Sequence, residues 1–238
     1  MDIAIILDGK MSPEQIVELR ADFTESLSPE GFIVEARGSG VVAFKRKGIA
    51  GEVVEELHIH GAFVHIVCNE YRGWTFTRDT AIKRLTPLFS RLKDGRAKFS
   101  SAGMSFQDVF LSDDPGNYFL SDVFRVGNRF LAPAISEGHN RWKQDVSWVG
   151  KKTESAFVTA DTFLKIEAKI ASSDPEDKQS HVTEITHRQL ASWKSGKVTA
   201  LTDESYFREV LNELHCRNKS LLLELLNDEM ISKIGLKE

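Results

Sequence analysis

Residues 55–74 read EELHIHGAFVHIVCNEYRGW, and their alternating apolar and polar side chains predict two β-strands joined by a turn. The Gly61–Ala62 pair suits a two-residue type II′ turn. On that register the aliphatic side chains cover one face of the hairpin and the histidines lie on the other. If the strand instead runs straight through Gly61, the histidines no longer share a face.

The predicted histidine face carries His58, His60 and His65, and Glu56 lies on the same face. A zinc site needs neutral imidazoles that converge on the ion at ~2.0–2.1 Å, together with a fourth ligand or water. Neighbouring strand residues splay rather than converge, and no fourth ligand is evident nearby. We therefore expect an ordinary hairpin face and no cofactor. A metal-dependent hydrolase that uses the three histidines is the alternative.

Upstream of the hairpin, residues 2–7 predict a strand and residues 12–27 predict a helix. Ser12 is a good N-cap, Pro13 suits the first helical position and Gln15 completes a capping box. Two short strands, FIVEARG and GVVAFKRKG, are expected between this helix and the hairpin.

Downstream of the hairpin, residues 74–95 predict a helix that Thr77 caps and that Pro87 bends or shortens. Apolar residues at helical spacing predict a long helix up to residue 226 and a short helix at 227–236. Further strands are expected over residues 97–114, 118–133, 141–151, 155–171 and 181–196.

The order of these elements predicts an α+β fold with a mostly antiparallel sheet. Strands lead into an aromatic-anchored helix in each half of the chain. We therefore expect two loosely duplicated lobes, residues 1–111 and 112–238, each packed by a long helix and joined in one compact unit.

Composition excludes several classes of protein. The 238 residues are 41% hydrophobic and 28% charged, which is typical of a globular protein. The net charge of −4 disfavours a general electrostatic grip on nucleic acid. No phosphate loop or dinucleotide-binding fingerprint is present. Two distant cysteines, no signal peptide and no long apolar run predict a cytoplasmic protein without a membrane span.

Aromatic and basic residues supply the candidate binding surfaces. Trp142 and Trp148 are six residues apart and share a strand face, where they form part of the core or an aromatic platform; we favour the core. The run of Lys45, Arg46 and Lys47 is a basic cluster, and such clusters are more often solvated faces than nucleic-acid sites. The candidate binding residues are Tyr71, Trp74, Trp142, Trp148, Lys45, Arg46 and Lys47.

The YRGW motif, the strand KFSSAGMSFQDVFL and the terminal LNELHCRNKSLLLELLNDEMISKIG together resemble a sporadically distributed bacterial family of uncharacterised proteins. Tyr71, Gly73 and Trp74 match its Tyr-x-Gly-Trp signature, and His215 matches a position in its closing helix. The family's arginine-rich strand has no arginine in SSAGMSFQDVF. The resemblance implies no established activity, and by analogy its patchy occurrence suggests bacterial defence or mobile-element neighbourhoods.

The absence of a catalytic constellation, a cofactor motif and a strong charge field favours a non-enzymatic binding protein. We expect a protein partner, as for an accessory or antitoxin-like component of a bacterial antiviral defence or toxin–antitoxin module. A homo-oligomer is compatible with the sequence. A nucleic-acid binder that uses the basic run at residues 45–47 is a further alternative.

Overall fold

The computed structural model describes residues 1–37, 41–94, 99–133, 135, 141–150, 159–171, 179–193 and 204–236. Helices and strands follow one another in the order β1 (Asp2–Leu7), α1 (Pro13–Leu27), η1 (Ser28–Glu30), β2 (Ile33–Arg37), β3 (Val41–Lys47), β4 (Val53–Ile59), β5 (Phe63–Cys68), α2 (Trp74–Arg84), α3 (Thr86–Lys93), β6 (Phe99–Ser112), η2 (Leu120–Asp122), β7 (Trp142–Val149), β8 (Thr159–Ala171), β9 (Ser180–Ser192), α4 (Glu204–Leu225) and α5 (Asp228–Lys233).

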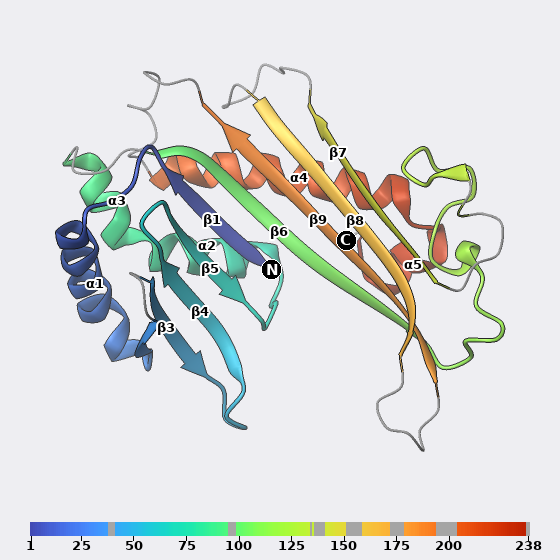
Figure 1. The fold of residues 1–238 in the computed structure, drawn as a ribbon, viewed down its shortest axis with the longest axis horizontal. Coiled ribbons are helices and arrows are strands. Elements are labelled where there is room, and N and C mark those ends of the chain that lie inside the picture. Colours follow the sequence, from blue (N-terminus) through green and yellow to red (C-terminus); the bar gives the residue numbers. More distant parts are fainter. Residues whose placement is uncertain are drawn as a thin grey trace. The chain divides into compact units, whose positions relative to one another are not determined.

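The strands form one antiparallel sheet in the order β2-β3-β4-β5-β1-β6-β9-β8-β7 (Figure 1). This arrangement confirms the predicted α+β class with its antiparallel sheet. Among the helices that the structure describes, none combines the length and the apolar composition needed to cross a bilayer.

The chain divides into two compact units, each built from three segments. Unit 1 comprises residues 1–104, 150–160 and 190–214, and unit 2 comprises residues 105–149, 161–189 and 215–238. Strands β6, β8 and β9 and helix α4 therefore contribute residues to both units. The duplication of two lobes and the boundary at residue 111 stay predictions.

Helix α1 begins as its sequence predicts. The Ser12 side chain accepts a hydrogen bond from the Gln15 backbone at 3.3 Å, and the Gln15 side chain accepts one from the Ser12 backbone at 2.8 Å. These two bonds satisfy backbone donors that have no partner inside the helix. Three residues at helical spacing, Leu19, Phe23 and Leu27, then bury one face of the helix in unit 1.

The predicted second helix is two helices, because α2 and α3 meet at Leu85, two residues before Pro87. The interruption that Pro87 predicts is thus confirmed. Thr77 does not cap this helix, so that prediction is wrong. The N-cap is Gly73, and the Thr77 hydroxyl donates to the Gly73 carbonyl at 2.8 Å from within the first turn.

The β4–β5 hairpin has the predicted register, with Leu57 opposite Ile66 and His58 opposite His65. The predicted type II′ turn is wrong, because Gly61 lacks the positive φ that this turn requires at its first central residue. Backbone N–H groups of Leu7 and Met11 donate to the turn carbonyls of Ala62 and Gly61, at 2.8 and 2.6 Å. These bonds from the end of β1 and the residues after it hold the turn in a conformation other than type II′.

Unit 2 has its own apolar core under the second half of α4. Leucines of α4 pack against β8 and β9 and against the segment that follows β6 (Figure 1). The buried members of this core are Tyr118, Val123, Phe124, Leu164, Ile166, Ile185, Leu221, Leu222, Leu225, Leu226 and Ile231.

The strand predicted over residues 118–133 is wrong. The segment contains the short helix η2 and turns, and its strand pairing is an isolated bridge between Phe124 and Leu226. Side chains replace the ladder: the Asn128 amide donates to the carbonyls of Glu224 and Leu225 at 3.0 and 2.9 Å. The apolar residues of this segment serve tertiary packing, which their partial alternation does not reveal.

A side chain at Gly73 is expected to destabilise the fold, although there is room for its Cβ atom. It has φ 92° and ψ 158°, a conformation in which an L-residue is strained by about 1–3 kcal/mol. Gly73→Ala should lower the free energy of unfolding by that amount in urea titrations. Gly61→Ala is the matched control, because neither glycine has an atom within 4 Å of the added Cβ and Gly61 has no positive φ. Equal stability of the two variants would contradict the strain.

Candidate functional site

The histidine face of the hairpin exists as predicted, but its rings stack. His58 and His65 have ring centroids 4.7 Å apart at an interplanar angle of 10°. His60 stacks on Phe63 at 4.0 Å and 20°. Stacked rings lie face to face with nearly parallel planes, whereas a metal ion requires ring nitrogens that point at a common centre.

The surroundings of His65 favour its neutral ring. The Nε2 atom of His58 lies 3.0 Å from a Glu56 carboxylate oxygen. Burial, and then the neighbouring His58 and His60, lower the pKa of His65 to about 4. Within the described residues no group of three His, Cys, Asp or Glu side chains is arranged to hold a metal ion. The metal site stays a prediction, and the stacked geometry does not support it.

The pKa of His65 predicts a stability that falls in acid. Below pH 6.5 the unfolded chain takes up a proton at His65, while the folded protein keeps the ring neutral until about pH 4. The free energy of unfolding should therefore fall as the pH is lowered from 6.5 to about 4, by about 1–2 kcal/mol once solvent screening is allowed for. His65→Phe removes the titrating group and should flatten this dependence in urea titrations at several pH values. An unchanged slope in the variant would contradict the assignment.

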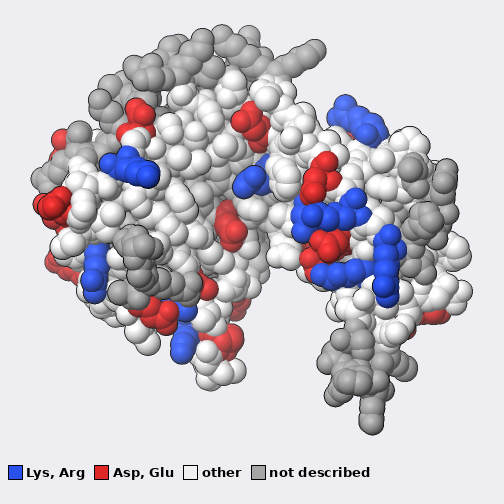
Figure 2. Space-filling view, in the orientation of Figure 1, with Lys and Arg blue, Asp and Glu red and all other residues white. Residues whose placement is uncertain are grey.

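The basic run at the end of β3 does not form a positive patch. Lys45 pairs with Glu35 at 2.8 Å, and Arg46 pairs with Glu55 at 3.0 Å. Lys47 is exposed. Acidic and basic side chains are also interspersed over the face drawn in Figure 2. The nucleic-acid alternative therefore gains no support from these residues.

The tyrosine and tryptophan of the YRGW motif have different surroundings. Tyr71 is half exposed. Trp74 begins α2, and its indole N–H donates to the Asn212 side chain at 3.1 Å. Arg78 donates to the same Asn212 oxygen at 2.8 Å. Trp74 thus ties α2 to α4 within unit 1, which is a structural contact.

Trp142 and Trp148 share the inner face of β7, as the sequence predicts. Both are partly buried and pack against the core of unit 2. Trp148 stacks on Phe130 at 5.3 Å and 20°, and Trp142 lies 6.0 Å from Phe124. This packing supports the core interpretation over an open aromatic platform.

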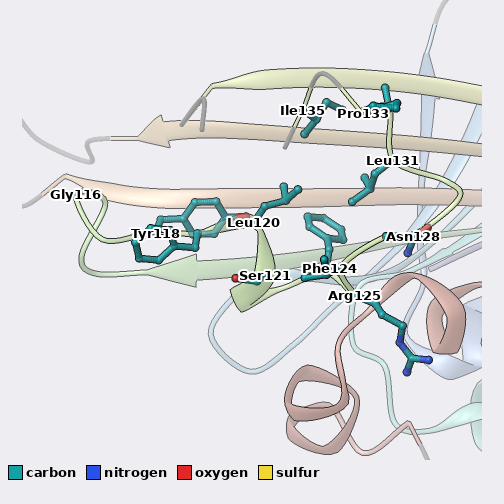
Figure 3. A pocket seen from close by; sticks show the side chains of 14 residues that line it. Gly116, Tyr118, Leu120, Ser121, Phe124, Arg125, Asn128, Leu131, Pro133 and Ile135 are labelled. Atoms are coloured by element: carbon teal, nitrogen blue, oxygen red, sulfur yellow. The ribbon is translucent and has the colours of Figure 1, made fainter. Parts of the chain in front are cut away.

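Unit 2 contains a cavity of about 830 Å³ between the turns that follow β6 (Figure 3). Its volume lies within the range of protein binding pockets. Most lining side chains are apolar. They come from Tyr118, Phe119, Leu120, Phe124, Val126, Leu131, Ala132, Pro133 and Ile135.

Polar contacts outside the cavity hold its wall in place. The Tyr118 hydroxyl bonds with the Thr183 hydroxyl at 2.8 Å, and its ring stacks on His181 at 3.5 Å and 14°. Burial raises the pKa of Tyr118, so this phenol stays neutral. Arg125 points away from the apolar side chains (Figure 3) and pairs with Asp228 at 3.1 Å.

The cavity has the chemistry of a binding site. In the part of the chain that the structure describes, no Asp, Glu, His or Cys lines it, so its lining offers no nucleophile–base pair. The sequence does not predict this cavity, because the partial alternation over residues 118–133 favours a strand. The signal that could have revealed it is a run of aromatic and aliphatic residues broken by Gly127, Asn128 and Pro133.

The predicted site residues are thus dispersed. The structure brings together His58, His60 and His65, and separately Trp142 and Trp148 with the core of unit 2. No protein-family model matches the chain, and no curated protein is significantly similar to it. The family resemblance therefore stays a prediction, and the function must be inferred from the geometry.

Proposed function

We propose that this chain is a non-enzymatic binding protein whose cavity in unit 2 receives apolar side chains of a protein partner. The observation that carries this proposal is an apolar cavity of about 830 Å³ whose lining reaches solvent through Phe119 and Val126. These two side chains are 63% and 84% exposed. Apolar surface that continues from a cavity into solvent is typical of interaction sites.

The two exposed residues favour a protein over a small molecule. A ligand held inside the cavity leaves Phe119 and Val126 in water. A partner surface covers them as well, and burial of one such side chain stabilises a complex by about 1.5–3 kcal/mol. Interfaces commonly insert an apolar anchor into a pocket and cover the surrounding surface. The cavity and its two exposed residues match that arrangement.

An antitoxin-like or accessory role in a defence module belongs to the same proposal, and its support is the sequence resemblance alone. The two alternatives, a metal-dependent hydrolase and a nucleic-acid binder, are less favoured. The first lacks converging ligands at His58, His60 and His65, and the second lacks a positive patch at residues 45–47.

The test is a comparison of variants in affinity purification from the native host with quantitative mass spectrometry. Ala132→Trp fills the cavity from an exposed position, and Phe119→Ser with Val126→Ser removes the exposed apolar surface. Ala132→Ser and Val17→Ser are the controls, because the first preserves the cavity and the second changes a 64% exposed valine of unit 1.

A partner retained by the wild type and both controls, and lost by both cavity variants, is the expected result. The same partners on all variants would refute the proposed site. Suppose that a small molecule copurifies with the wild type and is absent from Ala132→Trp, and that no protein partner is found. This result would show that the cavity binds a small molecule and not a protein.

A further inference from the structure

Unit 1 contains a second, smaller pocket of about 240 Å³ beside η1, β3, β4 and α2. Its lining is charged. Among the described lining residues, four basic ones, Arg46, Arg72, Lys83 and Arg84, meet three acidic ones, Glu30, Glu55 and Glu70, which leaves a surplus of one positive charge. Among the described residues, none lines both this pocket and the cavity of unit 2.

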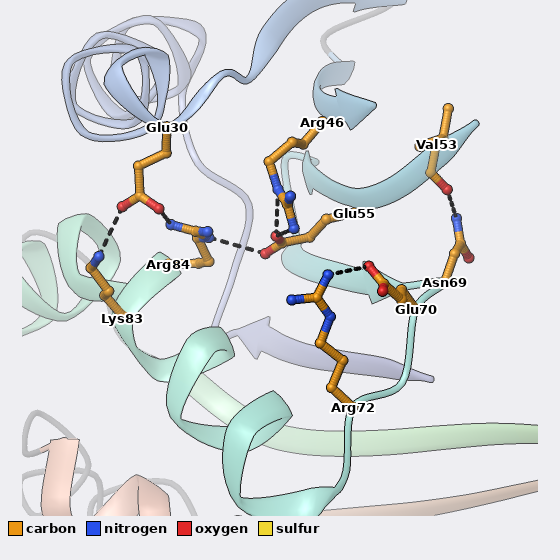
Figure 4. A network of polar contacts seen from close by, with 9 residues as sticks. All are labelled: Glu30, Arg46, Val53, Glu55, Asn69, Glu70, Arg72, Lys83 and Arg84. Atoms are coloured by element: carbon orange, nitrogen blue, oxygen red, sulfur yellow. Dashed lines mark hydrogen bonds and ion pairs between the residues drawn. The ribbon is translucent and has the colours of Figure 1, made fainter. Parts of the chain in front are cut away.

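The carboxylates of this pocket are already engaged (Figure 4). Glu55 is 3% exposed, and it accepts a hydrogen bond from Arg84 Nε at 3.0 Å and from Arg46 Nη2 at 3.0 Å. Glu30 accepts from Arg84 and pairs with Lys83 at 3.0 Å. Bonds to these two cations lower the pKa of Glu30, so it stays ionised.

The guanidinium groups are not fully engaged. Each arginine has five N–H donors. Within the described residues, Nη2 of Arg84, Nη1 of Arg46 and Nη1 of Arg72 have no hydrogen-bond partner. Figure 4 shows these three guanidinium groups approaching the Glu55 carboxylate from different sides. Donors on three arginines that line one pocket are thus available to a bound group.

Aromatic rings hold these guanidinium groups in place. Arg84 lies over the ring of Phe32 at 5.1 Å, Arg46 lies over the same ring at 5.9 Å, and Arg72 lies over Phe76 at 5.6 Å. Arginines that stack on rings keep the orientation of their donors, so a ligand that binds them loses less entropy. Arg84 is itself only 7% exposed, so it is a buried part of the pocket lining.

We propose that this pocket binds the phosphoryl group of a small molecule. Its volume of about 240 Å³ lies below the roughly 300–1,000 Å³ typical of ligand pockets, which suits a group as small as a phosphate. Arginine forks match phosphate oxygens geometrically, and donors on three arginines suit a tetrahedral group better than a planar carboxylate. Arg72 is the most exposed of the three arginines, because its pair with Glu70 at 2.8 Å is half exposed on both sides.

The test is calorimetric titration of the full chain with inorganic phosphate and with O-phosphoserine at constant ionic strength. Arg72→Gln should weaken binding about tenfold, since one charge-assisted contact is lost. Glu70→Gln removes the competing carboxylate and should tighten binding severalfold, an effect that a purely structural role for Glu70 does not produce. Arg20→Gln changes an exposed arginine of α1 and should have no effect.

The two probes identify the source of the phosphoryl group. Binding of inorganic phosphate alone assigns the free ion, and comparable binding of O-phosphoserine assigns a phosphomonoester. Equal heats with sulfate or chloride, or affinities that neither Arg72→Gln nor Glu70→Gln changes, would overturn the proposal.

Discussion

Arg84→Met is expected to lower the free energy of unfolding by about 3–5 kcal/mol, because it leaves a buried carboxylate partly unpaired. The side chains of Arg84 and Glu55 are 8% and 4% exposed. After the change Glu55 keeps Arg46 but loses its bond to Arg84, and Glu30 loses a partner as well. Methionine retains much of the aliphatic volume, so the loss reports charge and not packing.

Urea titration followed by near- and far-ultraviolet circular dichroism measures this loss and shows whether the chain unfolds in one step. Arg72→Met is the matched control in the same pocket. Its pair with Glu70 is half exposed on both sides, and such pairs contribute about 0–1 kcal/mol. Arg84→Met with Glu55→Met should recover most of the stability, because no carboxylate then stays buried without its partner. Similar small losses for Arg84→Met and Arg72→Met would contradict this account.

Signals carried by neighbouring residues predicted the first helix, its capping box and the hairpin register. Ser12 and Gln15 are three residues apart, and the β4–β5 register follows from a side-chain period of two around a short turn. Pro87 likewise acts on its own helix. Each of these features depends on interactions within a few residues, so a single sequence contains the information.

Features that depend on distant residues escaped prediction. Arg84 and Glu55 are 29 residues apart in the sequence, and nothing in either neighbourhood marks them as partners. Residues 118–133 alternate enough to suggest a strand, yet bonds from Asn128 to the end of α4 hold them in turns around the cavity. Only the tertiary fold brings these groups together.

Unit 2 holds a second buried polar cluster that local sequence could not indicate. His187 on β9 is fully buried. Its Nε2 lies 2.7 Å from an Asp108 oxygen on β6, and its Nδ1 contacts the Asn218 side-chain oxygen on α4. The three residues are 79 and 31 positions apart. Phe106 stacks on the imidazole at 5.4 Å and 7°, which fixes the plane of the ring.

His187→Phe is expected to lower the free energy of unfolding by about 2–4 kcal/mol. The new ring keeps the stacking on Phe106, but it leaves the Asn218 amide, which is 3% exposed, without its partner on β9. An unsatisfied buried group of this kind costs about 1–3 kcal/mol, and the lost contact to a carboxylate adds to it. The Asp108 side chain is 34% exposed, so water replaces part of that contact. The measurement is again urea titration, near neutral pH.

Asn218→Leu added to His187→Phe separates this polar cost from overpacking. Leucine has the branched skeleton of four side-chain heavy atoms that asparagine has, and no hydrogen-bonding group, so the double variant should be more stable than His187→Phe by at least about 1 kcal/mol. Overpacking by the larger ring would not be relieved by this second change, because the space around the ring stays the same. A double variant no more stable than His187→Phe would therefore show that the loss of stability comes from overpacking by the larger ring and not from the unsatisfied polar group. Wild-type stability of His187→Phe itself would show that the contacts of His187 with Asp108 and Asn218 do not stabilise the fold.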